Sequence, residues 1–275
     1  MPTVLITGTS TGFGRAIAER FDKAGWNVAA SMRDPAKSPF PKTWFTPALD
    51  VTDRASITRA VAETRERFGT IDVLVNNAGY SLMGIFEELP AAGIHDEFAV
   101  NVFGPMDVTR AVLPIMRAQE GGAIVNVTSG SGLYAVPMLS AYHASKFAIE
   151  GWSESLSFEL GAIGIRVKCV EPGACLTTSF APRAIAEAGG TTPIADYGVF
   201  RSQMNAMFSR QGQVKLATPA DIAETAFVAA TDRSPRLRYP VGPDIEPFIT
   251  ARQTFGEERY RAFMLETFGQ SPGKA

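Results

Sequence analysis

Short apolar runs alternate along the chain with longer segments of helical periodicity, and this alternation limits the possible folds more than any other feature. The runs with the length of buried strands are Thr3–Thr7, Asn27–Met32, Trp44–Ala48, Asp72–Asn76, Ala123–Thr128 and Ile165–Val170. Strands that are apolar on both faces and separated by helices are typical of a parallel sheet covered on both sides. We therefore expect an α/β fold with a doubly wound parallel sheet.

Capping residues mark the ends of several expected helices. Asp53 or Thr52 precedes an amphipathic segment that ends at Gly69, Gly25 follows the first helix, and Thr218 precedes another helix. The expected helices are Arg15–Ala24, the segment between Asp53 and Gly69, Glu97–Met116, one that begins near Tyr142, one that begins at Pro219, and Pro247–Phe268.

The 275 residues contain 45% hydrophobic and 20% charged residues, as in globular proteins, and no repeat or linker divides them. We therefore expect a single domain over residues 1–275. The regular alternation stops between residues 174 and 216, where Gly, Pro and Thr mix with bulky apolar side chains. A segment of this length without regular pattern predicts a functional loop, which we interpret as a lid over the substrate.

Charge and cysteine content exclude several classes of function. The net charge of -2 gives no strong attraction for nucleic acid or anionic membranes. The two cysteines, Cys169 and Cys175, have no partners at metal-ligand spacing, so we expect neither a metal site nor a disulfide framework. No apolar stretch is long enough for a membrane span, and no signal-peptide pattern is present at Met1. A cytoplasmic protein is the expectation.

A glycine-rich turn connects the first expected strand to the first helix. Gly8, Gly12 and Gly14 lie in the pattern G-x-x-x-G-x-G, which differs from the general dinucleotide fingerprint G-x-G-x-x-G. Such a turn lets the backbone approach a pyrophosphate, whose charge the helix N-terminus stabilises. The alternative is a turn that needs glycine only for packing.

The end of the second expected strand indicates which dinucleotide binds. The strand ends at Met32-Arg33, so the position of the carboxylate that holds the ribose of NAD is not acidic, and an arginine stands nearby. We expect Arg33 and Ser10 to hold the 2′-phosphate of NADP(H). Asp34 weakens the local positive potential, which leaves NAD(H) as the second choice, and a solvated Arg33 is the alternative.

A tyrosine and a lysine four residues apart form the expected catalytic pair. Tyr142 and Lys146 share one face at the start of a helix, and an adjacent ammonium is expected to lower the pKa of a tyrosine. Ser129 follows the strand Ala123–Thr128 and should lie at the same sheet edge as the glycine turn. Together these residues predict a tuned general acid.

The sequence resembles the short-chain dehydrogenase/reductase family. Six motifs occur in the order and at the spacings of that family, over about residues 3–245: Thr7-Gly8-x-x-x-Gly12-x-Gly14, Asn76-Asn77-Ala78-Gly79, Asn101, Ser129, Tyr142-x-x-x-Lys146 and Pro172-Gly173. The resemblance implies a single Rossmann-fold domain with about seven strands. It also implies homodimers or homotetramers formed through the helices that carry Asn101 and Tyr142.

The resemblance implies a role for each matching residue. Tyr142 would protonate the substrate carbonyl oxygen, Ser129 would orient that oxygen, Lys146 would lower the tyrosine pKa and hold the nicotinamide ribose, and Asn101 would keep a water that links Lys146 to solvent. The implied cofactor-binding residues are Gly8, Ser10, Thr11, Gly12, Phe13, Gly14, Arg33, Asp50, Val51, Asn77, Ala78, Gly79, Tyr142, Lys146, Pro172, Gly173 and Thr177. Asp50 and Asn77 also have structural alternatives, as a helix cap and as a tie between strands.

Pro105 follows Asn101 by four residues and has no N–H to donate to the Asn101 carbonyl. We therefore expect a kink at which that carbonyl is free to hold a water. His143 lies between the catalytic residues but off their helical face, and we assign it no role.

The expected substrate is a neutral, fairly hydrophobic ketone or aldehyde, or the matching secondary alcohol, because the loops after the strands carry few charges. The walls of its pocket are expected at Tyr80, Ser81, Leu82, Met83, Leu133, Tyr134, Pro137 and Met138. The alternatives are an acyl-carrier-linked 3-ketoacyl reductase, a reductase of carbon–carbon double bonds, and a dinucleotide sensor without turnover.

Overall fold

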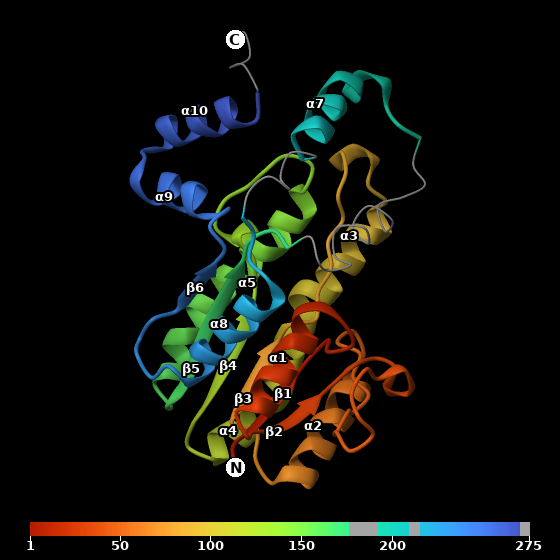
Figure 1. The fold of residues 1–275 in the computed structure, drawn as a ribbon, viewed down its shortest axis with the longest axis vertical. Helices are drawn as coiled ribbons and strands as arrows, with labels where there is room; N and C mark the ends of the chain where they lie inside the picture. The colour runs from red at the N-terminus through yellow and green to blue at the C-terminus, as the bar shows by residue number, and fades with distance from the viewer. Residues whose placement is uncertain (176–191, 209–214, 270–275) are drawn as a thin grey trace.

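A computed structural model describes residues 1–175, 192–208 and 215–269 of the chain (Figure 1). Six parallel strands form one sheet in the order β2-β1-β3-β4-β5-β6. The strands are β1 (Thr3–Ile6), β2 (Asn27–Ala30), β3 (Val73–Asn76), β4 (Gly122–Val127), β5 (Ile165–Pro172) and β6 (Arg238–Val241). The expected doubly wound α/β fold is confirmed.

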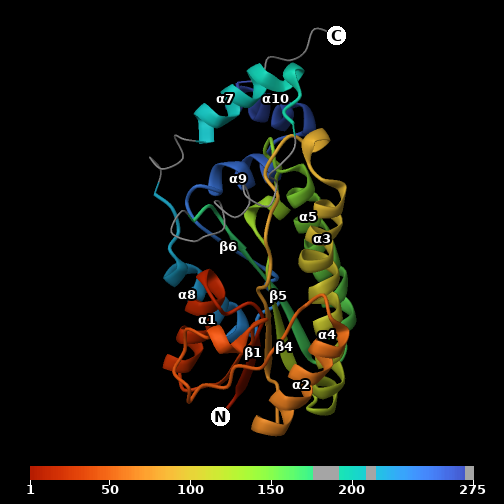
Figure 2. The ribbon, with the colours of Figure 1, turned by 90° about the vertical axis from the view of Figure 1, so that its right-hand side faces the viewer.

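Helices cover both faces of the sheet. The helices that the structure describes are α1 (Gly12–Lys23), α2 (Arg54–Phe68), α3 (Ala91–Phe98), α4 (Gly104–Ala118), α5 (Ser140–Gly161), α7 (Gly198–Phe208), α8 (Pro219–Thr231), α9 (Glu246–Thr254) and α10 (Glu257–Thr267). Figure 2 shows α1 and α8 on one face of the sheet and α2, α4 and α5 on the other. Among the described residues, no helix is both long and apolar enough to cross a membrane.

The predicted caps are present. The Asp53 carboxylate accepts a hydrogen bond from the Ala55 N–H at the start of α2, and Gly69 ends that helix with a φ of 81°. Thr218 and Asp221 form a reciprocal capping box at the start of α8. Local sequence therefore fixes where both of these helices begin.

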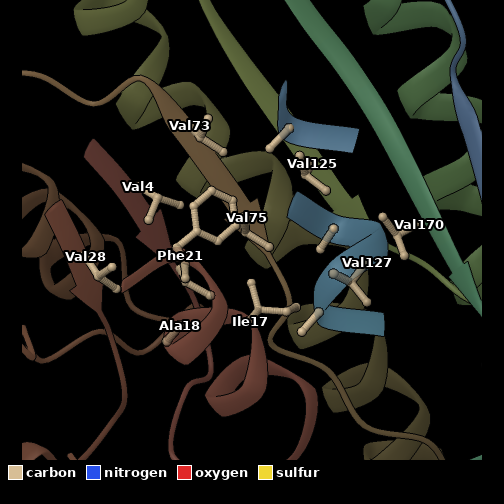
Figure 3. Packing of buried hydrophobic residues seen from close by; sticks show 14 of the residues in the cluster. Val4, Ile17, Ala18, Phe21, Val28, Val73, Val75, Val125, Val127 and Val170 are labelled. Atoms are coloured by element: carbon tan, nitrogen blue, oxygen red, sulfur yellow. The ribbon is translucent and has the colours of Figure 1, made fainter. Parts of the chain in front are cut away.

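Two hydrophobic clusters attach the helices to the sheet. On the side of α1 and α8, Phe21 lies against Val4, Val75 and other strand valines, and meets Phe227 edge-on at 5.1 Å (Figure 3). On the other side, α2, α4 and α5 bury a second cluster around Leu74 and Ile124. Helices cover both faces of each central strand. The side chains on both faces of these strands are therefore mostly apolar and buried.

The structure corrects two expectations about strands. The segment Trp44–Ala48 forms two isolated parallel bridges rather than a strand, Phe45 to Ala29 in β2 and Ala48 to Met32 just after β2. Pro47 lies between the bridged residues and has no N–H to donate, so the ladder is interrupted there. The sheet therefore has six strands instead of about seven, and β6, which carries Pro240 on the edge of the sheet, is a strand that the apolar runs did not predict.

Two expected helices are divided. The segment Pro247–Phe268 consists of α9 and α10, separated at Phe255-Gly256. The segment Glu97–Met116 contains a π-helical turn at Ala99–Phe103 between α3 and α4, in which the Gly104 N–H donates to the Ala99 carbonyl five residues earlier. The expected irregularity near Asn101 is therefore present.

A third hydrophobic cluster, which we call the cap cluster, lies beyond the end of the sheet where α7, α9 and α10 gather (Figures 1 and 2). Its buried members are Tyr134, Met204, Ile245, Ala251, Tyr260, Met264 and Phe268. The C-terminal helices thus share a hydrophobic cluster with α7, which belongs to the expected lid. Residues 176–191 and 209–214 of that lid, and with them Thr177, lie outside the described residues.

Candidate active site

The strand order reverses between β1 and β3, because the chain moves outward from β1 to β2 and then returns to the other side of β1. In open parallel sheets, ligands bind at the carboxyl ends of the strands at such a switch point. The glycine turn follows β1 and Asn77-Ala78-Gly79 follows β3, so both motifs lie at this crevice. Ser129 follows β4 by two residues, and Pro172 ends β5 at the same edge.

The glycine turn is a cradle that side chains would fill. Gly8 and Gly12 have φ values of 71° and 57°, and a Cβ on Gly14 would lie 2.2 Å from the Gly8 carbonyl oxygen. The N-cap of α1, Thr11, makes no side-chain capping bond, and the first turn of this helix has no acidic residue. The free N–H groups and the positive end of the helix dipole therefore fit a dinucleotide pyrophosphate.

The strand-linking alternative for Asn77 is also realised. Its side-chain amide donates to the carbonyls of Thr7 and Gly8 at 3.0 and 3.1 Å, and the Thr7 hydroxyl accepts from the N–H groups of Asn77 and Ala78. These bonds fix the distance between the two motifs of the crevice. Asn77 thus holds the backbone that surrounds the expected ribose site.

The residues expected around the adenosine have defined surroundings. Arg33 is exposed and makes no hydrogen bond or ion pair with another described residue. The Asp34 carboxylate accepts from the Ala36 N–H and pairs with Lys37 at 3.0 Å, which lowers the pKa of Asp34. Asp50 bonds the N–H and hydroxyl of Thr52, a local turn rather than a helix cap, and Val51 packs against Gly104.

The segment after β5 is held by one carboxylate. Asp244 accepts from the Ala174 N–H at 2.8 Å, and its Oδ1 lies 2.3 Å from the position that a Cβ of Gly173 would occupy. Glycine is therefore required at position 173 for this contact. The Pro172-Gly173 motif lies at the carboxyl end of β5, next to the end of β4.

Tyr142, Ser129 and Lys146 lie together as expected. The Tyr142 side chain is hydrogen-bonded to Ser129. Lys146, on the next turn of α5, donates to the Val127 carbonyl at 3.3 Å, and its Nζ lies 5.7 Å from the centroid of the Tyr142 ring. Both Tyr142 and Lys146 are buried, with 6% and 7% of their surface exposed. The arrangement can deliver a proton to a carbonyl oxygen held beside Ser129.

The electrostatics of the pair differ from the expectation that Lys146 lowers the tyrosine pKa. Burial raises the pKa of Tyr142 above its ordinary value, the bond to Ser129 opposes this rise, and the charge of Glu97 adds to it. Burial also lowers the pKa of Lys146 to about 8, against the attraction of Glu97 and Glu150. Desolvation is the largest influence on the pKa of both groups in this structure.

Asn101 lies within the π-helical turn and holds the loop after β3. Its side-chain amide donates to the Tyr80 carbonyl at 2.8 Å and to the Ser145 hydroxyl at 3.1 Å, and it accepts from the Tyr80 N–H. The amide is thus committed to the protein, which leaves the main-chain carbonyl as the group for the expected water.

Two buried carboxyl groups near the pair were missed by sequence reasoning. Glu97 precedes Asn101 by one helical turn, and Glu150 follows Lys146 by one. The Glu150 carboxylate accepts from Thr128 at 2.6 Å and from Arg238 at 2.9 Å. The i, i+4 spacing from the expected site residues Asn101 and Lys146 was the available signal for both.

His143 links two parts of the loop after β4. One ring nitrogen lies 2.8 Å from the Ser131 carbonyl, and the other accepts from the Val136 N–H at 2.9 Å. Burial lowers the pKa of this histidine. The neutral ring therefore stabilises the loop after β4.

A pocket of about 510 Å³ lies between the loop after β3, the start of α5 and α7. Its lining is mainly apolar and consists of Gly84, Ile85, Phe86, Glu87, Met138, Ser140, Tyr197 and Phe200. Met138 was expected there, whereas Tyr80 and Leu82 are buried in a small cluster with Leu89, and Tyr134 is in the cap cluster. Within the described ranges, no group of three His, Cys, Asp or Glu side chains could hold a metal.

Comparison with known proteins gives consistent results. The sequence pattern of a family described as short chain dehydrogenase matches residues 2–188. An uncharacterized oxidoreductase of Schizosaccharomyces pombe is 38% identical over 222 residues, covering 80% of this chain and 91% of that protein. An NADPH-dependent 3-dehydrocapnine reductase of Ornithobacterium rhinotracheale is 31% identical over 255 residues, covering 88% and 89%. The crystal structure of a short-chain dehydrogenase from Streptomyces avermitilis superimposes with a TM-score of 0.79 at 34% identity, covering 96% and 95%.

Proposed function

The chain belongs to the short-chain dehydrogenase/reductase family and is an oxidoreductase, and we propose that it transfers a hydride between NADP(H) and a hydrophobic carbonyl compound. The substrate class is a neutral ketone or aldehyde, or the matching secondary alcohol. The observation that carries the proposal is the hydrogen-bonded pair of Tyr142 and Ser129, backed by the buried Lys146, at the crevice of the sheet.

The side chains divide the work of the reaction. Ser129 orients the carbonyl oxygen by a hydrogen bond, and the Tyr142 hydroxyl gives its proton to that oxygen during reduction. In oxidation, Tyr142 takes the proton from the alcohol. A bound nicotinamide dinucleotide supplies or accepts the hydride. The buried ammonium of Lys146 favours the tyrosinate, which forms when Tyr142 gives up its proton in reduction and is the base that takes the proton in oxidation.

The surroundings of Arg33 support NADP(H) over NAD(H). The guanidinium is exposed and unpaired among the described residues, while the nearby Asp34 carboxylate is engaged by Lys37 and Ala36. A guanidinium binds a phosphate through several charge-assisted hydrogen bonds. The relative from Ornithobacterium rhinotracheale, named as NADPH-dependent, agrees with this choice.

The apolar pocket supports a hydrophobic substrate. Ile85, Met138 and Phe200 supply its walls, and Ser140 brings it to the helix turn that carries Tyr142. A relative from Bacteroides thetaiotaomicron is named as a 3-ketodihydrosphingosine reductase, which supports a ketone as the compound reduced.

The first test needs no substrate. Purified protein is titrated with NADPH and with NADH, and quenching of its three tryptophans is followed. Tighter binding of NADPH is expected, and absence of binding by either nucleotide would refute the proposed function. Apolar ketones and aldehydes are then screened for oxidation of NADPH.

Tyr142→Phe is expected to lower kcat by about 10²- to 10⁴-fold while NADPH still binds, because only the proton donor is lost. Tyr260→Phe removes the hydroxyl of a buried tyrosine in the cap cluster and serves as the matched control. NADPH binding without turnover of any carbonyl compound would instead favour the dinucleotide sensor. Turnover restricted to carrier-bound thioesters would favour the 3-ketoacyl reductase.

A further inference from the structure

We propose that Glu97 is the buried counter-charge of Lys146, and that it keeps this lysine protonated behind Tyr142. Glu97 would then be a positioning residue, which acts on the reaction through Lys146 and not by contact with the substrate. The catalytic consequence rests on the proposed function, whereas the pairing of the two charges does not.

Glu97 is buried where an apolar residue would be expected. It has no exposed surface and is the one buried residue of α3, in which Ile94 and Phe98 are only partly buried. Its Oε1 accepts a long bond of 3.4 Å from the Leu82 N–H, and its Oε2 has no hydrogen-bond partner among the described residues. An unsatisfied buried carboxyl is costly and requires an explanation.

The loop after β3 places Glu97 beside the catalytic lysine. A Cβ on Gly79 would lie 3.1 Å from the Asn101 Oδ1 and 3.8 Å from the Lys146 Nζ. Both side chains therefore approach the backbone at Gly79, which places Lys146 close to the turn that contains Asn101. One and three residues further on, the same loop binds Asn101 and Glu97 through the main chain of Tyr80 and Leu82. Glu97 and Asn101 are one helical turn apart, and therefore share the face that Lys146 approaches.

The charged and titratable groups that act on Lys146 come from two helices, α3 and α5. Glu97 from α3 and Glu150 from α5 favour its ammonium form, and burial opposes them. Glu150 is already bonded to Thr128 and to the Arg238 guanidinium, so its negative charge is shared. Among the described residues, Lys146 is the one cation that acts on Glu97, and the Glu97 charge also acts on Tyr142.

The two groups influence each other in opposite directions. Burial raises the pKa of Glu97 to about 7, and the Lys146 charge opposes this rise. Burial lowers the pKa of Lys146 to about 8, and the Glu97 charge opposes that fall. Between these two pKa values both groups are charged, and the charge of each group favours the charged form of the other.

The test follows Lys146 directly by NMR of protein labelled with ¹³C-lysine, without cofactor or substrate. The chain has seven lysines, and Lys146→Met assigns the signal. In Glu97→Gln the titration midpoint of Lys146 is expected to move to lower pH by about one to three pH units, because an opposite charge is lost. The control is Asp96→Asn, which removes an equal charge from an exposed neighbour on α3 and should leave the midpoint in place.

A reciprocal measurement protects the test against misfolding of Glu97→Gln. With ¹³C-glutamate, the midpoint of Glu97 is expected to rise in Lys146→Met, since coupling between two sites must act equally on both. An unchanged Lys146 midpoint in folded Glu97→Gln, or an unchanged Glu97 midpoint in Lys146→Met, would overturn the proposal. Because neither measurement uses a substrate, failure of the proposed carbonyl reduction would leave these results intact.

Discussion

Glu171 in β5 is fully buried, and neither of its carboxylate oxygens has a hydrogen-bond partner among the described residues. Burial and the neighbouring Glu150 raise its pKa to about 9, against the attraction of Arg238 and Arg236. The side chain is therefore neutral at physiological pH in the folded protein and ionised in the unfolded chain.

This difference predicts how stability depends on pH. The contribution of Glu171 to the free energy of unfolding is fully present below its ordinary pKa of 4.5 and is lost as pH rises through about 9. The slope is on the order of 1 kcal/mol per pH unit for one proton. Glu171→Gln stays neutral in both states, so urea unfolding at pH 5, 7 and 9 should show a flatter dependence. Glu159→Gln, an exposed control on α5, should keep the slope of the wild type.

Arg33 carries the predicted cofactor preference. Arg33→Ala is expected to weaken NADPH binding by about 10- to 100-fold, the loss of a charged hydrogen bond, while NADH binding stays the same. Fluorescence titration with both nucleotides measures the ratio. Arg54→Ala removes an exposed arginine that pairs with Asp107 instead, and should not change it. An unaltered ratio in Arg33→Ala would show that the arginine is merely solvated.

At the residue scale, sequence reasoning predicted that the proposed catalytic groups lie together, but it did not predict their electrostatics. Ser129, Tyr142 and Lys146 meet because strand ends and the i, i+4 spacing of a helix place them without further information. The pKa of Tyr142 depends instead on how completely other elements bury it, which no local pattern specifies. Glu97 was missed for the same reason, since a glutamate in a helix is normally solvated.

The helix that carries Asn101 changes its hydrogen-bond pattern at that residue. The π-helical turn Ala99–Phe103 ends directly before Gly104-Pro105, at the first turn of α4. Pro105 cannot donate to the Asn101 carbonyl, and π-helical turns are frequent at functional sites. The turn therefore gives a structural basis to the expected water site.

Pro105→Ala tests this basis. The new N–H can bond the Asn101 carbonyl in the ordinary i, i+4 pattern, so the π-helical turn should become α-helical and kcat should fall by about 10- to 100-fold with a changed pH profile. A crystal structure and kinetics of the variant measure both effects. Pro114→Ala alters the other proline of α4, away from Asn101, and should leave the profile as it is. The same profile in both variants would contradict the role of Pro105.

At the element scale, long periodic segments with caps were predictable and short irregular ones were not. The ends of α2 and α8 follow from Asp53, Gly69 and Thr218. The strand β6 has four residues with an arginine and a proline, and is a strand only because β5 offers its free edge. Pairing with a distant segment decides such cases, and it cannot be read from local periodicity.

In the whole molecule, the cap cluster is separate from the two clusters that attach helices to the sheet. It joins α7 to α9 and α10, and Glu88 connects α7 to the loop after β3 through the Ile194 N–H and an ion pair with Arg201. Regions with their own small core open locally at lower free energy than the central sheet. The cap cluster is therefore expected to open as a unit.

Two methionines, each almost completely buried, test this separation. Met204 on α7 belongs to the cap cluster, whereas Met116 on α4 belongs to the cluster that attaches α2, α4 and α5 to the sheet. Met116→Ala should lower the global free energy of unfolding by about 2–5 kcal/mol. Met204→Ala should speed hydrogen exchange in α7, α9 and α10 and leave exchange in β1, β3 and β4 unaltered. Equal effects of both variants on the sheet would mean that the molecule unfolds only as a whole.

Because all six strands run in the same direction, the turns that lead from helices into strands lie at the edge opposite to the chemistry. The turns after α1, α2 and α4 centre on Gly25, Gly69 and Gly121, and a Cβ on Gly25 or Gly69 would meet no atom within 4 Å. Exposed tips of this kind tolerate inserted peptides and new chain ends. A fluorescent tag or a surface tether placed there would leave the nucleotide crevice untouched, so the enzyme can be immobilised with its active face toward the solvent.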